Sequence, residues 1–255
     1  MNALTLTPTA FLIVCPLLFL AGFVDSIAGG GGLISLPAYL FAGLPTHMAI
    51  GTNKLSSTCG TALTTARFIR GGLISWRLAL PGIAAAMVGS ACGSRLSLLA
   101  DERVIRGVLF AVLPAAAFIV LNPRFFPERE ERETKADART VTVCVLAALI
   151  IGFYDGFYGP GTGTFLIIAF TAFGGLSVGA ANAHAKAINL TTNITSLLVF
   201  LRGGTVLIPL GLAAAACNML GNYVGSGLAM RSGAKITRPI ILVVLALLLV
   251  KLVTE

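Results

Sequence analysis

Long stretches without a charged side chain restrict the fold of this chain more than any other feature of its sequence. Among its 255 residues, 56% are hydrophobic and 11% are charged, whereas a soluble domain has roughly 25% charged residues. A soluble protein cannot hide so much apolar surface, because part of every compact fold faces water. We therefore expect an all-α polytopic membrane protein. The longer stretches free of Asp, Glu, Lys and Arg include 1–24, 26–53, 78–94, 107–123, 140–154, 156–185, 187–201, 203–230 and 239–250.

These stretches predict about eight transmembrane helices, since a straight span needs about 20 mostly apolar residues. Two further apolar segments, 33–44 and 163–174, are shorter, and each follows a glycine-rich break. We expect them to be half-helices or re-entrant segments. The long helices are predicted at 8–28, 48–68, 78–98, 104–122, 140–158, 181–201, 206–229 and 237–254.

The formal net charge of +8 does not indicate a nucleic-acid-binding protein, because most basic residues lie in short gaps between apolar stretches. That pattern is typical of loops that flank membrane helices. The five cysteines are isolated, and without a CxxC or Cys/His spacing they predict neither a metal site nor another cofactor. No basic residue precedes the first apolar run, 11–24, so we interpret it as a membrane helix and not as a signal peptide.

The chain contains two copies of one unit. The segment GFVDSIAGGGG at 22–32 matches GFYDGFYGPGT at 152–162 with a shift of 130. After a two-residue insertion the shift becomes 132, and Lys54 then matches Lys186. Chance alignment of apolar sequence could supply the glycines, but it would hardly supply paired Asp, Lys and Arg residues in the same order. The sequence therefore predicts two homologous repeats.

The repeats divide the chain into a first repeat at 1–123, a cytoplasmic linker at 124–139 and a second repeat at 140–255. If each short segment completes a crossing, the repeats are inverted in the membrane; otherwise they are parallel. The inverted arrangement divides the loop Lys and Arg residues eleven to five between the two sides, and the parallel arrangement divides them ten to six. An excess of these residues marks the cytoplasm, and both arrangements place the linker there. We favour inversion, a common plan among transporters.

Four charged side chains lie inside or between apolar segments: Asp25, Lys54, Asp155 and Lys186. Charges at membrane depth are costly and usually functional. One interpretation is an anion site in which the two lysines are electrostatic anchors. The alternative is structural, namely two buried salt bridges in which each Asp neutralises a Lys.

A row of polar residues follows each lysine at steps of three, seven and ten. These positions share one face of a helix. The rows predict hydrogen-bond partners for a bound anion, and the alternative is that they join neighbouring helices. The rows are Ser57, Thr61 and Thr64 in the first repeat, and Asn189, Asn193 and Ser196 in the second. We assign to the anion site, besides the lysines, Asn53, Ser57, Thr61, Asn189 and Asn193.

The glycine-rich breaks, GGGG at 29–32 and GPGTG at 159–163, free the backbone for unusual angles. Irregular backbone at membrane depth is tolerated only where it is buried or lines a cavity. A half-helix that starts after such a break points its N–H groups at the cavity and attracts anions. The glycines that we assign to the anion site are Gly31, Gly32, Gly161 and Gly163.

Three residues are candidates for coupling the anion to a proton. Asp25 and Asp155 each lie one turn before a glycine-rich break, from which they can reach the cavity. His184 lies two positions before Lys186 and can carry a proton, although it can equally be an ordinary polar residue at a helix start. We favour Asp155 as the coupling aspartate, because its repeat also contains His184.

The segment GFVDSIAGGGGLISLPAYLFAGLPTHMAIGTNKL at 22–55 resembles the TauE/SafE family of membrane permeases, also called the TSUP family. The FIRGG at 68–72, the GFYDGFYGPGTGTF at 152–165 and the NAHAKAINLTTN at 182–193 extend the match over essentially the whole chain. One departure is visible, since AHAKAIN in the second repeat stands where the first has GTNKLSS. Equal roles for the two repeats therefore cannot be assumed.

The resemblance implies a multi-pass protein of the bacterial inner membrane that moves sulfite, a sulfonate or a related organic acid. We expect a secondary transporter, acting as an exporter, and not an enzyme. A passive anion channel is the alternative. An intramembrane enzyme would need a nucleophile with its base or a metal cluster, and the sequence offers no such constellation. The expected partners are a small anion and the lipid bilayer; a homodimer is left open, and nucleic acid is not expected.

Overall fold

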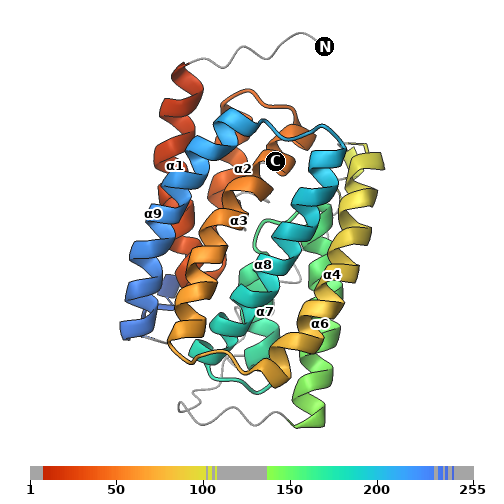
Figure 1. Cartoon of the computed structure of the whole chain (residues 1–255), viewed down its shortest axis with the longest axis vertical. Coiled ribbons are helices and arrows are strands. Elements are labelled where there is room, and N and C mark those ends of the chain that lie inside the picture. Colours follow the sequence, from red (N-terminus) through yellow and green to blue (C-terminus); the bar gives the residue numbers. More distant parts are fainter. Residues whose placement is uncertain are drawn as a thin grey trace.

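The computed structural model describes residues 8–101 and 137–232, with some isolated positions after each segment. Within these residues the chain forms eight α-helices and no strand. Figure 1 shows α3 and α8 in the centre, with α1 and α9 on one side and α4 and α6 on the other. The isolated positions are 103, 104, 107, 235–237, 239, 240 and 243. The helices are α1 (Pro8–Ala28), α2 (Gly32–Phe41), α3 (Thr46–Arg70), α4 (Trp76–Leu99), α6 (Ala138–Phe157), α7 (Thr162–Ala172), α8 (Val178–Arg202) and α9 (Ile208–Ser232).

The helices predicted within the described residues are confirmed, and their ends agree to within three residues. The short segments expected at 33–44 and 163–174 correspond to α2 and α7, of 10 and 11 residues. Most of the predicted helix at 104–122, most of the linker at 124–139 and most of the helix at 237–254 lie outside the described residues.

By length and composition, three of the described helices, α1, α4 and α6, are apolar enough to cross a membrane. Helices α3, α8 and α9 have 25 residues each. Such a helix is about 37 Å long, more than the roughly 30 Å of a hydrocarbon core. Their buried faces carry Lys, Asn, Ser and Thr, which lower their mean hydropathy. The chain is thus an all-helical membrane protein, and its two most polar described helices, α3 and α8, lie at its centre.

The long helices form two sets of parallel helices. In bundle A (α1, α3 and α9), the Asn218 amide donates to the Leu18 carbonyl and the Thr64 hydroxyl to the Asn222 side chain. Bundle B consists of α4, α6 and α8, and there the Ser90 hydroxyl meets that of Ser196. Each bundle therefore combines helices from both halves of the sequence.

The two bundles run in opposite directions. Across their interface Lys54 of α3 bonds to Asn193 of α8, whereas Thr65, further along α3, bonds to the carbonyl of Lys186. Residue numbers thus rise along α3 as they fall along α8. Helices at equivalent positions in the two halves are consequently antiparallel. These pairs are α1 and α6, α3 and α8, and α4 and α9.

Glycines allow the helices within each bundle to touch through their backbones. A Cβ on Gly89 of α4 would lie 2.2 Å from the Leu149 carbonyl oxygen of α6. The equivalent Gly221 of α9 would meet the Phe19 carbonyl oxygen of α1 at 2.0 Å. Both distances are too short for a side chain, so the same close contact fixes both bundles.

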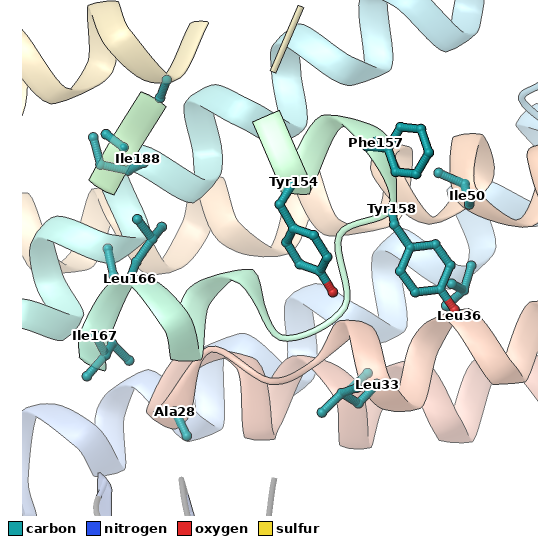
Figure 2. Packing of buried hydrophobic residues seen from close by; sticks show 14 of the residues in the cluster. Ala28, Leu33, Leu36, Ile50, Tyr154, Phe157, Tyr158, Leu166, Ile167 and Ile188 are labelled. Atoms are coloured by element: carbon teal, nitrogen blue, oxygen red, sulfur yellow. The ribbon is translucent and has the colours of Figure 1, made fainter. Parts of the chain in front are cut away.

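The half-helices α2 and α7 continue the chain after each break and bury apolar side chains in the centre. Figure 2 shows Leu166 of α7 and Leu33 of α2 among the buried hydrophobic residues, with Tyr154 between them. The Tyr154 hydroxyl donates to the Pro160 carbonyl at 2.7 Å, and the Thr164 hydroxyl donates to the Ala28 carbonyl at 2.7 Å. Side chains of the second half thereby hold both breaks in place.

Candidate functional site

The two glycine-rich breaks meet at the centre of the protein. Gly29 has a positive φ of 77°, and a Cβ there would lie 2.2 Å from the backbone carbon of Gly163. Gly159 and Gly161 of the second break have φ values of 102° and 84°. Only glycine adopts such angles at low cost, and only glycine leaves room for this contact. The sequence pattern thus produces two interrupted helices that touch at their interruptions.

Two ion pairs lie beside these breaks, and each joins the first half of the chain to the second. The Lys54 Nζ on α3 is 2.8 Å from Asp155 Oδ2 on α6. The Lys186 Nζ on α8 is 2.7 Å from Asp25 Oδ2 on α1. Both pairs therefore also join bundle A to bundle B. The salt bridges considered from the sequence are present, with each aspartate paired to the lysine of the other repeat.

A small cavity lies between the two ion pairs and the two breaks. Its volume of about 20 Å³ holds about one water molecule. Ten of the fourteen residues that the sequence assigned to substrate binding or coupling line it. These ten are Asp25, Gly32, Asn53, Lys54, Ser57, Thr61, Asp155, Gly163, Asn189 and Asn193, and the further lining residues are Gly29, Gly159 and Thr162.

The other four assigned residues, Gly31, Gly161, Lys186 and His184, do not border the cavity. Gly31 and Gly161 lie at the N-terminal ends of α2 and α7, one position before the helices start. Lys186 is fully buried behind Asp25, and His184 lies nearer the start of α8. Three further lining residues were not assigned from the sequence: Gly29, Gly159 and Thr162. All three lie within the glycine-rich breaks, so assigning each break as a whole would have included them.

The two lysines have different surroundings. Lys54 lines the cavity and donates a second hydrogen bond to Asn193 Oδ1 at 3.2 Å, and the Asn193 amide donates to Asn189 Oδ1 at 3.1 Å. Within the described residues, Lys186 donates from its Nζ to Asp25 alone. The position equivalent to Asn193 is Thr61, which lines the cavity without a bond to Lys186. The cavity is therefore bordered by one ammonium group and two carboxylates.

The four charged groups are also buried to different degrees. The exposed fractions of the Lys54 and Asp155 side chains are 2% and 3%. Those of Lys186 and Asp25 are 0% and 14%. Asp25 is thus the most accessible of the four charged side chains. Removing one partner of a buried ion pair costs roughly 3–5 kcal/mol, so both pairs hold the two bundles together.

His184 bonds to the turn between α3 and α4 and does not reach the cavity. Its Nδ1 lies 2.8 Å from the Ala180 carbonyl, to which it donates, and its Nε2 accepts from the Ser75 N–H at 3.0 Å. We assign this tautomer from the bonding partners. At the equivalent place in the first repeat, the Thr52 hydroxyl accepts from the Leu207 N–H at 3.0 Å. Each lysine-bearing helix therefore holds a turn of the other repeat in the same way.

Comparison with known proteins gives matches along almost the whole chain. A family model described as Sulfite exporter TauE/SafE matches residues 14–252. Probable membrane transporter protein ORF9 of Sinorhizobium sp is 36% identical over 247 residues, which cover 96% of this chain and 92% of that protein. Probable membrane transporter protein YfcA of Escherichia coli (strain K12) is 37% identical over 237 residues, which cover 92% of this chain and 87% of that protein.

A third relative, a Probable membrane transporter protein of Haemophilus influenzae, is 34% identical over 238 residues, covering 93% of this chain and 92% of that protein. No solved structure matches the chain significantly. The matched relatives are described as membrane transporters, and none of these three names specifies what is transported.

Proposed function

The chain belongs to the TauE/SafE family, and from this membership we propose that it is a secondary transporter that exports a small anion such as sulfite, a sulfonate or a related organic acid. The observation that carries the proposal is the Lys54 ammonium group at the wall of the central cavity. A buried cation between two interrupted helices is a binding point for an anion, because it has lost its hydration and cannot reach bulk water.

Uncharged groups around Lys54 complete the anion site. Ser57, Thr61, Asn189 and Asn193 border the cavity with hydroxyl and amide groups, which can donate hydrogen bonds to anionic oxygens. Gly32 and Gly163 border it from the first turns of α2 and α7, where helix N–H groups have no partner within the helix. An anion bound there would bond to Lys54, to one or two side chains and to the start of a half-helix.

A carrier fits the geometry better than a passive channel. The cavity is too small for a continuous pore, and the two ion pairs close it by joining the bundles. Movement of bundle A against bundle B would open the cavity first to one side of the membrane and then to the other. The transporter names of the relatives argue against an intramembrane enzyme.

For the membrane, we propose inverted repeats in a multi-pass protein of the bacterial inner membrane. The antiparallel directions of α1 and α6, α3 and α8, and α4 and α9 support inversion. The end of the molecule with the turn at 71–75 carries Arg67, Arg70, Arg77 and Arg139, which supports a cytoplasmic location for that end.

Cysteine labelling tests this orientation in a variant without the native cysteines. Leu73→Cys lies at the proposed cytoplasmic end and Arg202→Cys at the opposite end, and both positions are exposed. We expect an impermeant thiol reagent to label Arg202→Cys in intact cells, and Leu73→Cys only in inverted vesicles. Labelling of both positions from the same side would contradict the inverted arrangement.

The transport proposal is tested by counterflow in proteoliposomes. Liposomes containing the purified protein are loaded with unlabelled sulfite, sulfoacetate or methanesulfonate, and uptake of the same labelled anion is followed. A carrier gives a transient accumulation that depends on the internal anion, whereas a channel gives simple equilibration. No protein-dependent uptake of any of the three anions would contradict the proposed substrate class.

A further inference from the structure

The charges around the cavity cancel in the structure. Lys54 and Lys186 carry two positive charges, and Asp25 and Asp155 carry two negative charges. Helices α2 and α7 contain no charged residue, and Arg231, the charged residue of α9, lies in its last turn. Among the described residues, no other charged side chain therefore borders the cavity.

An anion that enters this neutral cluster adds an uncompensated negative charge. Such a charge is expensive in a medium of low dielectric constant unless a positive charge accompanies it. The anion would also lie in a cavity that two carboxylates border. Repulsion between like charges at this range favours protonation of one carboxylate. A proton taken up with the anion returns the cluster to neutrality.

Asp25 is the carboxylate placed to take up that proton. It lines the cavity, and its side chain is 14% exposed, compared with 3% for Asp155. The ionisable groups around it are Lys186 on α8 and, across the cavity, Lys54 and Asp155. Asp155 is almost fully buried against Lys54, and His184, for which the sequence favoured Asp155, bonds to Ser75 and does not border the cavity.

We propose that one proton accompanies each anion, that Asp25 carries it, and that transport of a monoanion is therefore electroneutral. This inference rests on the proposed function. The Asp25 carboxylate takes up a proton from the aqueous solution on one side of the membrane, forming an O–H bond, and this bond breaks when the proton is released to the solution on the other side. While Asp25 is neutral, the charge of Lys186 balances that of the anion at Lys54.

The proposal gives the two lysines different roles. Lys54 contacts the anion, whereas Lys186, which is fully buried outside the cavity lining, is a positioning residue that holds Asp25. It also fixes what drives export. An electroneutral carrier ignores the membrane potential, so accumulation of the anion in the cytoplasm drives it outward, and an acidic exterior opposes it.

The experiment measures labelled methanesulfonate in proteoliposomes, since this sulfonate is a monoanion throughout the working pH range. A gradient of about one pH unit, acidic outside, should accumulate the anion about 10-fold at zero potential. A potential of about 100 mV set with potassium and valinomycin should leave the distribution unchanged, whereas it would shift an uncompensated monoanion about 50-fold. A shift of that size in the wild-type protein would overturn the inference while leaving anion transport in place.

The variant Asp25→Asn locates the proton, with Asp155→Asn as the matched control from the equivalent position. Asp25→Asn should still exchange methanesulfonate, lose the 10-fold accumulation and acquire the response to potential. Asp155→Asn should keep its response to pH. The reverse pattern would assign the proton to Asp155. If Asp25→Asn does not fold, the wild-type measurement still decides whether transport is electroneutral. If the wild-type protein does not exchange methanesulfonate, the proposed function is overturned for sulfonates, and this inference with it.

Discussion

The two halves of the chain place the same backbone and the same kind of ion pair at the centre, yet they surround the two lysines differently. Lys54 of the first half borders the cavity and bonds to Asn193. Lys186 of the second half is fully buried, and Thr61 occupies the position equivalent to Asn193. A repeated scaffold can therefore hold one lysine for the substrate and another for the coupling carboxylate. Variants at equivalent positions in the two halves test this division of roles.

The largest effects are expected from removing the lysines. Lys54→Ala and Lys186→Ala should each destabilise the protein by roughly 3–5 kcal/mol, because an aspartate remains buried without its partner. Removing both partners avoids that cost and separates stability from binding. We expect Lys54→Ala/Asp155→Ala to fold but not to bind, and Lys186→Ala/Asp25→Ala to fold and still exchange the anion.

Thermal unfolding with and without the anion measures both quantities, because a ligand that binds only the native protein raises its stability. Equal loss of binding in the two double variants would mean that both lysines contact the anion, as a symmetric site requires. Single variants that bind normally but unfold at much lower temperature would favour a purely structural role for the ion pairs.

The next effect concerns the second partner of Lys54. Asn193→Thr introduces the residue of the first half and removes the amide oxygen that accepts from Lys54. Hydrogen bonds to charged groups contribute about 1.5–3 kcal/mol, so the affinity for the anion should fall by about 10-fold or more. The matched variant Thr61→Asn adds an amide at the equivalent position of the first half and should change affinity much less. Initial rates of exchange against anion concentration give both values, and equal changes would remove the distinction between the halves.

Much of this arrangement could be predicted from the sequence, because the features involved are local. Helix positions follow from the length of charge-free stretches, and the two breaks follow from glycine runs. The polar rows beside Lys54 and Lys186 follow from helical periodicity. The burial of Lys54 and Lys186 inside the protein follows from the high cost of exposing a charge to the apolar part of the membrane.

The pairing of these residues could not be predicted, because it depends on which helices share a bundle. The sequence does not reveal that Asp155 pairs with Lys54 and not with the nearer Lys186. That choice follows from α1 packing on α9, and α6 on α4, so that each aspartate faces the other repeat. The same exchange of helices brings His184 to Ser75 and away from the cavity. That His184 carries a proton stays a prediction, and its bond to Ser75 shows that it also holds the turn before α4.

A smaller effect is expected at the two turns that the lysine-bearing helices hold. His184→Ala removes the acceptor of the Ser75 N–H, and Thr52→Ala removes that of the Leu207 N–H. A buried donor left without a partner costs about 1–3 kcal/mol, so each variant should unfold at a lower temperature. His184→Thr introduces the first-half residue and should recover part of the loss. Unchanged stability in both alanine variants would show that neither bond holds its turn.

The smallest effect concerns the start of α6 and depends on pH. The Asp137 carboxyl accepts from the Thr140 N–H at 2.7 Å, which lowers the pKa of this exposed carboxyl below its ordinary value. A lowered pKa means that the carboxyl stabilises the fold above its ordinary pKa and loses this effect as the pH falls through the lowered value. Asp137→Ala should therefore unfold at a slightly lower temperature than the wild type at neutral pH, and the difference should disappear in acid. Asp137→Asn keeps a capping group that does not titrate, so its stability relative to Asp137→Ala should not vary with pH. If the wild type remains more stable than Asp137→Ala in acid, the ionised Asp137 carboxylate is not the stabilising group.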